Sequence, residues 1–352
     1  MLKKALIHIG MHKCGTTSIQ NSLVGFDDGV TKYAKLRNNP NHSIPFQLIF
    51  TENNQDLMSF KRRGFGKKEI DKEKEMSKKN LLKEIKDTDR ERIIFCGEAI
   101  SAFSKEIFSK KMINFFEKRN IETEIFVYVR SPAEWRRSLF QQQIKVGNKD
   151  IDQYLKKKSG FRKKFSRYKK LFREGRFNIK KFDRDNFTGK CVVADFCSLI
   201  DIQKPKIINS NESLSFSAIK LLYIFNKSIE LTKGDKAIYL ARRDLFAAIR
   251  DLFASHDKMD INYFKNDDSD DLNFLKNIFS VEFNDEVYDK NVYQGDLEKD
   301  IKNISKNEIN MLNDLLDKNE INLKMSLTPE NKINALFNKF IENRQKRNKS
   351  LI

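Results

Sequence analysis

The segment IGMHKCGTTS, residues 9–18, could bind the phosphate groups of a ligand. It joins a short apolar run to a helical pattern, and the backbone N–H groups at a helix start favour an anion. Gly10 and Gly15 have the GxxxxG spacing of a P-loop, but Thr16 stands where a Walker A loop has its lysine. The alternative is an ordinary turn between a strand and a helix. The candidate anion-binding residues are Lys13, Cys14, Gly15, Thr16 and Thr17.

The segment YVRSPAEWRRS, residues 128–138, carries a second candidate site for a phosphate group. Arg130 follows an apolar run, and Ser131 with Pro132 predicts that a helix starts directly after it. Ser138 then lies two turns along that helix. The guanidinium of Arg130 can bind phosphate through two hydrogen bonds, and the Ser138 hydroxyl could add a third. The alternative is an arginine that only caps the edge of a sheet.

Glu98 follows the predicted strand Arg92–Cys96 and could accept a proton from a substrate. Lys13, Glu98 and Arg130 each follow a separate predicted strand. Because ligands bind at the carboxyl ends of the strands in open α/β sheets, we expect these three side chains to lie together. A lone glutamate is about as often a surface or salt-bridged residue. His12 is a second candidate base at this site.

The first 200 residues alternate β-branched or aromatic runs with helical patterns, which is typical of an α/β fold. We predict a P-loop-like parallel sheet flanked by helices, followed by a mostly helical C-terminal extension. Residues 1–225 are expected to form the α/β domain, and residues 226–352 a helical region packed on it. Helices are expected from Thr16, within residues 61–92 and over residues 209–226. The predicted strands are Ala5–Ile9, Arg92–Cys96, Glu124–Val129, Phe177–Phe182 and Cys191–Val193.

The net charge of +19 could indicate nucleic acid, an anionic lipid surface or an acidic substrate as the partner. The alternative is a compositional drift toward lysine, asparagine and isoleucine that implies no partner. Eleven basic and two acidic residues lie between positions 151 and 176. Within this run Phe161, Phe165, Tyr168 and Phe172 recur at helical spacing, so an amphipathic helix facing the core is favoured. The alternative is a basic face for an anionic glycan or for peripheral contact with an anionic membrane surface.

Other features limit the classes of protein to be considered. No apolar run exceeds five residues, which is far below the ~20 residues of a membrane span. Four cysteines without a CxxC pair indicate neither a disulfide framework nor a zinc site, so no metal is expected. We therefore expect a cytoplasmic protein.

The two candidate phosphate segments together resemble a known enzyme family. Residues 7–20 (IHIGMHKCGTTSIQ) are similar to the 5′-phosphosulfate loop of sulfotransferases that use 3′-phosphoadenosine 5′-phosphosulfate (PAPS). Residues 126–143 (FVYVRSPAEWRRSLFQQQ) resemble the motif of that family for the 3′-phosphate, and residues 95–98 (FCGE) lie where carbohydrate-type members carry a catalytic glutamate. Residues 211–215 (NESLS) are similar to a segment of bacterial members.

The resemblance implies a PAPS-dependent sulfotransferase whose acceptor is a glycan or another molecule with a hydroxyl group. Lys13 would stabilise the leaving phosphate, Glu98 would act as the base, and Arg130 with Ser138 would bind the 3′-phosphate. Cys14 stands where many members have threonine or glycine. The alternatives are a P-loop kinase, which the threonine at position 16 disfavours, and a nucleic-acid-binding protein, which only the charge supports.

Overall fold

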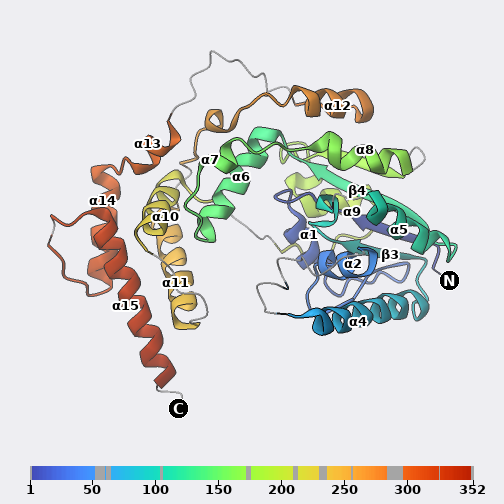
Figure 1. Cartoon of the computed structure of the whole chain (residues 1–352), viewed down its shortest axis with the longest axis horizontal. Helices are drawn as coiled ribbons and strands as arrows, with labels where there is room; N and C mark the ends of the chain where they lie inside the picture. Colours follow the sequence, from blue (N-terminus) through green and yellow to red (C-terminus); the bar gives the residue numbers. More distant parts are fainter. Residues whose placement is uncertain are drawn as a thin grey trace. The chain divides into compact units, whose positions relative to one another are not determined.

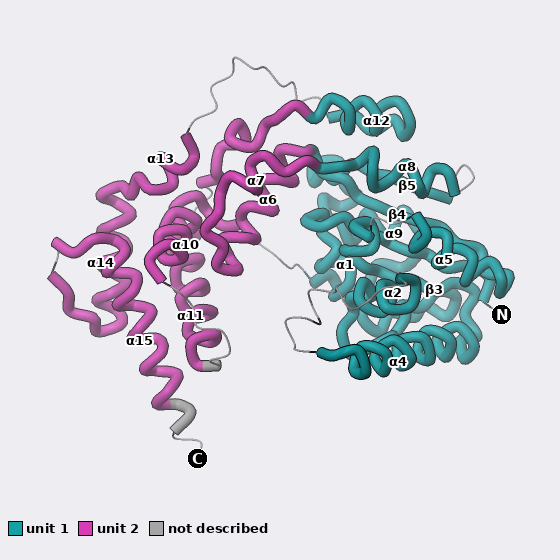
Figure 2. Tube along the Cα trace, viewed as in Figure 1, with its two compact units in different colours: residues 1–131, 159–211, 268–285 teal, residues 132–158, 212–267, 286–352 magenta. Residues whose placement is uncertain are grey.

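The structure is a computed structural model that describes residues 2–51, 60, 65–103, 106–171, 176–208, 213–229, 236–254, 257–283, 296–324 and 326–349. The chain divides into two compact units, each made of three separate segments (Figure 2). Unit 1 comprises residues 1–131, 159–211 and 268–285. Unit 2 comprises residues 132–158, 212–267 and 286–352.

Unit 1 contains a sheet of five parallel strands in the order β2-β3-β1-β4-β5. Figure 1 labels β3 and β4 of this sheet. The sheet confirms the α/β class and four of the predicted strands. Three residues are too short to display a periodicity, which explains why β2 was not predicted. The strands are β1 (Lys4–His8), β2 (Thr31–Tyr33), β3 (Arg92–Cys96), β4 (Glu122–Val129) and β5 (Phe177–Lys181).

β1 and β3 lie inside the sheet and are buried along almost their whole length, which favours apolar residues in both strands. Ala5, Leu6 and Ile7 of β1 are buried, and so are residues 93–96 of β3. The described helices of unit 1 are α1 (Thr16–Leu23), α2 (Ser43–Phe50), α4 (Lys67–Lys86), α5 (Glu106–Glu117), α8 (Phe161–Leu171), α9 (Val192–Leu199) and α12 (Ser269–Phe279). α1 packs against α9, whereas α2, α5 and α8 pack successively against one another.

The strand predicted at Cys191–Val193 is wrong, because Cys191 precedes helix α9. A pair of valines favours a strand locally, but tertiary contacts override this preference. Val193 and Phe196 are fully buried and lie three residues apart, which is the spacing of one helix face. α9 thus buries its apolar side against α1 and, through Phe196, against the rings of His8 and Phe126 in the sheet.

Helix α8 confirms the preferred interpretation of the aromatic stripe. Phe161, Phe165 and Tyr168 are fully buried, whereas Phe172 lies outside the described residues. The charged stretch at residues 61–92 contains α4, although residues 61–64 lie outside the described part of the chain.

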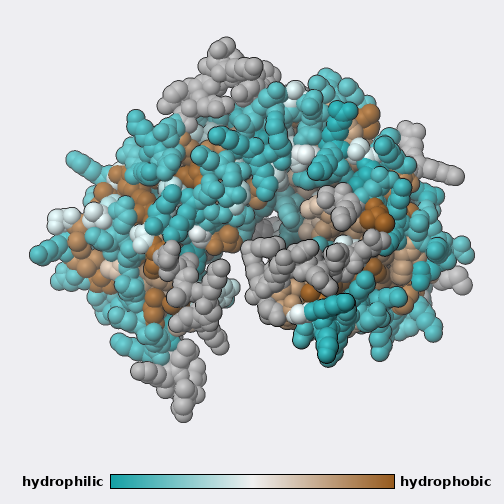
Figure 3. All heavy atoms as spheres, in the orientation of Figure 1, coloured by the Kyte–Doolittle hydropathy of each residue, from teal (hydrophilic) through white to brown (hydrophobic). Residues whose placement is uncertain are grey.

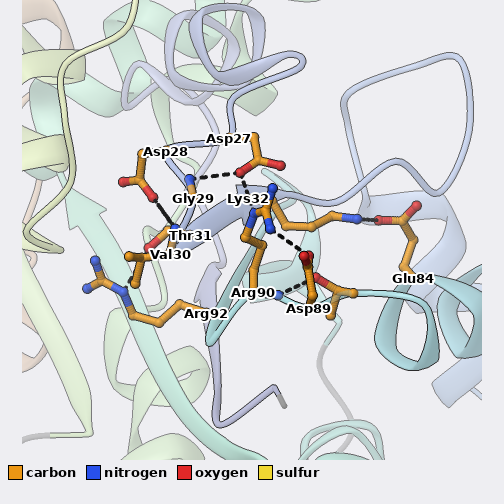
Figure 4. A network of polar contacts seen from close by, with 11 residues as sticks. Asp27, Asp28, Gly29, Val30, Thr31, Lys32, Glu84, Asp89, Arg90 and Arg92 are labelled. Atoms are coloured by element: carbon orange, nitrogen blue, oxygen red, sulfur yellow. Dashed lines mark hydrogen bonds and ion pairs between the residues drawn. The ribbon is translucent and has the colours of Figure 1, made fainter.

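The amino ends of β2 and β3 are joined by a network of ion pairs and hydrogen bonds (Figure 4). Arg90 Nε donates to Asp27 over 2.7 Å, and Lys32 pairs with Glu84 over 2.9 Å. Arg92 donates to the hydroxyl of Thr31 and to two carbonyl oxygens at the C-terminal end of α9. Several basic residues at this end of the sheet therefore have structural partners. Part of the positive net charge of the chain thus stabilises the fold and does not by itself indicate an anionic ligand.

Unit 2 is helical, which confirms a helical C-terminal region. Within the described residues its helices are α6 (Pro132–Lys145), α7 (Asp152–Leu155), α10 (Phe216–Ser228), α11 (Lys236–Leu252), α13 (Leu297–Lys302), α14 (Lys306–Lys318) and α15 (Pro329–Lys349). The expected boundary between residues 225 and 226 falls inside α10, because residues 221–225 of this helix are buried in the core of unit 2. The Ser215 hydroxyl caps α10 by accepting from the N–H of Ala218, and residues 209–212 lie outside the described residues.

Hydrophilic side chains cover most of the face seen in Figure 3. Large apolar side chains with substantial exposure occur on several elements of the described chain, among them Val24, Val146 and Tyr239. None of the described helices is long and apolar enough to span a membrane.

Candidate functional site

The loop that follows β1 packs against the turn that follows β3, and glycine permits this close approach. Gly10 has a φ of 105°, and a Cβ atom there would lie 2.4 Å from the carbonyl oxygen of Glu98. Gly15 has a φ of 74°, and a Cβ atom there would lie 2.8 Å from a methyl group of Val192 on α9. A larger residue at either position would force the loop away from its neighbour.

Backbone hydrogen bonds fix the same loop to β4. The N–H of Met11 donates to the carbonyl oxygen of Tyr128 over 3.2 Å, and the N–H of Tyr128 donates to Gly10 over 3.1 Å. Thr16 is buried, and its hydroxyl donates to the carbonyl oxygen of Met11 over 3.3 Å. The N-cap of α1 is Gly15, which supplies no side-chain hydrogen bond. The first N–H groups of α1 lack i−4 partners, which is the arrangement that binds anions.

Glu98 lies in a turn that is fixed to the end of β1. The N–H of Gly97 donates to the carbonyl oxygen of the last residue of β1 over 2.9 Å, and the N–H of Ser101 donates to Ile9 over 3.0 Å. The Glu98 side chain is 36% exposed, and its Oε2 lies 3.9 Å from Nδ1 of His12. This carboxylate is half-buried at the edge of the sheet, where it can contact a ligand and accept a proton.

Lys13, Glu98 and Arg130 lie close enough together for their charges to interact. Burial lowers the pKa of Lys13; the Glu98 carboxylate opposes this shift, and the Arg130 guanidinium adds to it. Arg130 is the first residue after β4, and its guanidinium lies 4.3 Å from the centre of the Phe182 ring. The structure therefore brings two cations and one carboxylate together at the carboxyl ends of β1, β3 and β4, as the sequence predicted.

The backbone N–H of Cys14 donates to the carbonyl oxygen of Met11 over 3.3 Å, and its thiol is not activated. Its side chain is fully buried, and burial raises the pKa of the thiol to about 11 although the charge of Arg130 opposes this shift. Lys164 on α8 also lowers the pKa of Cys14, so it lies near the loop, a proximity that the sequence did not predict. Thr17 is half-buried in the first turn of α1.

Ser138 is half-buried on α6. This helix belongs to unit 2, whereas Lys13, Glu98 and Arg130 belong to unit 1. The pairing of Ser138 with Arg130 at one phosphate group stays a prediction.

Asp195 is a buried residue near the site that the sequence did not single out. Its carboxylate accepts from the hydroxyl of Tyr128 over 2.7 Å and from Nζ of Lys180 over 2.8 Å. The N–H of Thr188 donates to the same carboxylate over 3.1 Å. Since Tyr128 also contacts the loop after β1, Asp195 stabilises the end of β4 from which Arg130 projects.

The two histidines near the loop differ in environment. His8 is fully buried with Nδ1 3.1 Å from Sγ of Cys96, and burial lowers its pKa to about 3. His8 is therefore a packed residue of β1 and not a candidate base. The side chain of His12 is 44% exposed beside Glu98, which leaves it as the second candidate base.

Comparison with protein-family models, with curated proteins and with solved structures finds no match for this chain. Within the part of the chain that the structure describes, no group of three or more histidine, cysteine, aspartate or glutamate side chains could hold a metal ion.

Proposed function

We propose that this protein is a sulfotransferase that transfers the sulfuryl group of PAPS to a hydroxyl group, through a P-loop-like site in unit 1. The observation that carries the proposal is the proximity of Lys13, Glu98 and Arg130 at the carboxyl edge of the parallel sheet. This edge is where open α/β sheets bind their ligands. The resemblance of the two phosphate segments to this family supports the same conclusion.

The loop at residues 10–17 suits the 5′-phosphosulfate of the donor. The N-terminal N–H groups of α1 can donate to its oxygens, and Lys13 supplies a positive charge beside them. Negative charge develops on the oxygen that bridges phosphorus and sulfur as the S–O bond breaks. Lys13 would stabilise this charge, which lowers the barrier to transfer.

Glu98 would accept the proton of the acceptor hydroxyl as its oxygen bonds to sulfur. The products are the sulfate ester, 3′-phosphoadenosine 5′-phosphate (PAP) and one proton, so the reaction balances without a metal or an oxidant. Arg130 would bind the 3′-phosphate and thereby orient the donor.

We propose a glycan as the acceptor, because Glu98 lies where carbohydrate-type members of the resembled family carry their base. We also propose that the reaction takes place in the cytoplasm. An assay of radiolabelled PAPS against a panel of oligosaccharide hydroxyls tests the acceptor class. Label transfer to a lipid or an amine acceptor in place of glycans would contradict this assignment.

PAP is expected to raise the melting temperature of the protein, because a ligand that binds only the folded state stabilises it. At a PAP concentration of about 100 times Kd the stabilisation is about 2.7 kcal/mol, which corresponds to several degrees. The measurement is a thermal unfolding curve with PAP and, in parallel, with ATP. Stabilisation by ATP and none by millimolar PAP would contradict the proposal and support a kinase.

The variant Arg130→Ala is expected to weaken PAP binding by about 1.5–3 kcal/mol, the range for hydrogen bonds to charged groups. Affinity for adenosine 5′-phosphosulfate, which has no 3′-phosphate, should change little. Calorimetric titration of both ligands measures the difference. The matched control is Arg119→Ala, which removes an exposed arginine that follows α5 and donates to the carbonyl oxygen of Phe115 on that helix. Equal losses for the two ligands would show that Arg130 does not bind the 3′-phosphate.

A further inference from the structure

The turn at residues 97–101, which we call the Glu98 turn, is held by elements far away in the sequence. One attachment is the pair of backbone bonds to the end of β1, from Gly97 and Ser101. These bonds fix the ends of the turn, but they leave the backbone around Glu98 itself to other partners. The partners come from the start of α2 and from α8.

Two consecutive residues, His42 and Ser43, contact the chain on both sides of Glu98. The N–H of His42 donates to the carbonyl oxygen of Cys96 over 2.9 Å, and Nδ1 of His42 accepts from the N–H of Cys96 over 3.0 Å. The hydroxyl oxygen of Ser43 accepts from the N–H of Ala99 over 3.0 Å. The residue directly after Glu98 therefore has its amide fixed by the first residue of α2.

These contacts are buried and closely packed. His42 is fully buried and Ser43 is 5% exposed. A Cβ atom at Gly97 would lie 2.9 Å from the backbone nitrogen of Ser43, so α2 starts directly against the Glu98 turn. Burial lowers the pKa of His42 to about 4, which keeps its imidazole neutral and able to accept from Cys96 at neutral pH.

Helix α8 contacts the far end of the turn. Arg167 is 6% exposed, and its guanidinium donates to the carbonyl oxygen of Ser101 over 3.0 Å. The amphipathic pattern of α8 predicts only a core-facing stripe, whereas the structure directs this one cation toward the Glu98 turn.

We infer that Ser43 is a positioning residue that sets the place of the Glu98 carboxylate, with His42 and Arg167 fixing the two ends of the Glu98 turn. This inference rests on the proposed function, in which Glu98 accepts the proton. A base must lie within hydrogen-bond reach of the hydroxyl, and a displacement of about 1 Å can lower a rate by about 100-fold. The Ser43 hydroxyl acts on the reaction through the backbone of Ala99 and does not touch the substrate.

The experiment compares Ser43→Ala with Ser77→Ala in the full-length protein. Ser77, on α4, is a matched control because it is also buried and its hydroxyl also accepts a hydrogen bond. The donor is the Arg37 guanidinium, at 3.2 Å. Turnover is measured as PAP release from PAPS, with water as the acceptor if no better acceptor is known. PAP affinity is measured by titration, and amide hydrogen exchange is followed at Ala99 and Met11.

Ser43→Ala is expected to lower kcat by about tenfold, with PAP affinity and the KM for PAPS unchanged, because the donor loop keeps its own hydrogen bonds. The amide of Ala99 should exchange faster while that of Met11 does not. Ser77→Ala should lose similar stability but retain its kcat. A Ser43→Ala protein with normal kcat, or one with equally weakened PAP binding, would overturn the inference. A wild-type protein that binds PAP but releases none from PAPS would overturn the proposed function, and this inference with it.

Discussion

The variant Glu98→Gln is expected to lose turnover by about 10²–10⁴, which is the usual contribution of a positioned base. Glutamine keeps the shape of the side chain but cannot accept a proton from the acceptor hydroxyl. The side chain is partly exposed, and its pairing with His12 spans 3.9 Å, so the fold does not depend on its charge. PAP affinity and the melting temperature should therefore stay close to those of the wild type.

The matched control for Glu98→Gln is Glu91→Gln. Glu91 directly precedes β3, at the opposite end of the strand from Glu98, and forms an exposed ion pair with Lys3. Removing the negative charge of Glu91 should leave turnover unchanged. If Glu98 is only a counter-charge for Lys13, Glu98→Gln would instead lower stability and keep its activity per folded molecule. A folded, PAP-binding Glu98→Gln protein with near-normal turnover would exclude Glu98 as the base, and His12→Asn would be the next variant to test.

The candidate site could be predicted from sequence because each of its charged residues follows a strand with a strong local signal. β1, β3 and β4 are buried apolar runs, and parallel pairing places their carboxyl ends side by side whatever the rest of the fold does. The register confirms this, since His8 pairs with both Cys96 and Phe126. The two glycines, Gly10 and Gly15, mark in the sequence the loop that follows β1, and so they also identify the anion-binding candidates between and directly after them.

Other parts of the site depend on contacts between distant segments, and these leave no local pattern. His42 and Ser43 lie more than fifty residues before the Glu98 turn that they contact, and the polar residues around them read as an ordinary turn. Asp195 lies in a segment whose valines suggest a strand. Its role follows only from the hydrogen bonds with Tyr128 and Lys180 that the folded chain creates.

The division into units was also beyond the reach of sequence patterns. The chain enters unit 2 at Pro132, directly after the segment that carries Arg130, and returns to unit 1 for residues 159–211. A change in composition can reveal a boundary that the chain crosses once. It cannot reveal a helix such as α6, which resembles its neighbours in composition but buries its apolar side chains in another core.

Lys13→Met is expected to lower kcat by about 10²–10³, the cost of removing one group that stabilises developing negative charge. Methionine keeps the apolar stem of the side chain and removes the ammonium group that lies with Glu98 and Arg130. Steady-state PAP release from PAPS measures the loss. Lys13→Arg is the matched control, because it retains a positive charge at the same position and should recover part of the activity.

The pH dependence of kcat/KM distinguishes a charge effect at Lys13 from a packing effect. Burial lowers the pKa of Lys13 below that of an ordinary lysine, so the free enzyme loses this charge as the pH rises through the lowered value. The wild-type profile should therefore fall on its alkaline side below the usual lysine range. Lys13→Arg should lose this alkaline limb, because arginine stays charged over the whole accessible range. An alkaline limb that persists unchanged in Lys13→Arg would show that another group titrates there, and that Lys13 contributes through packing.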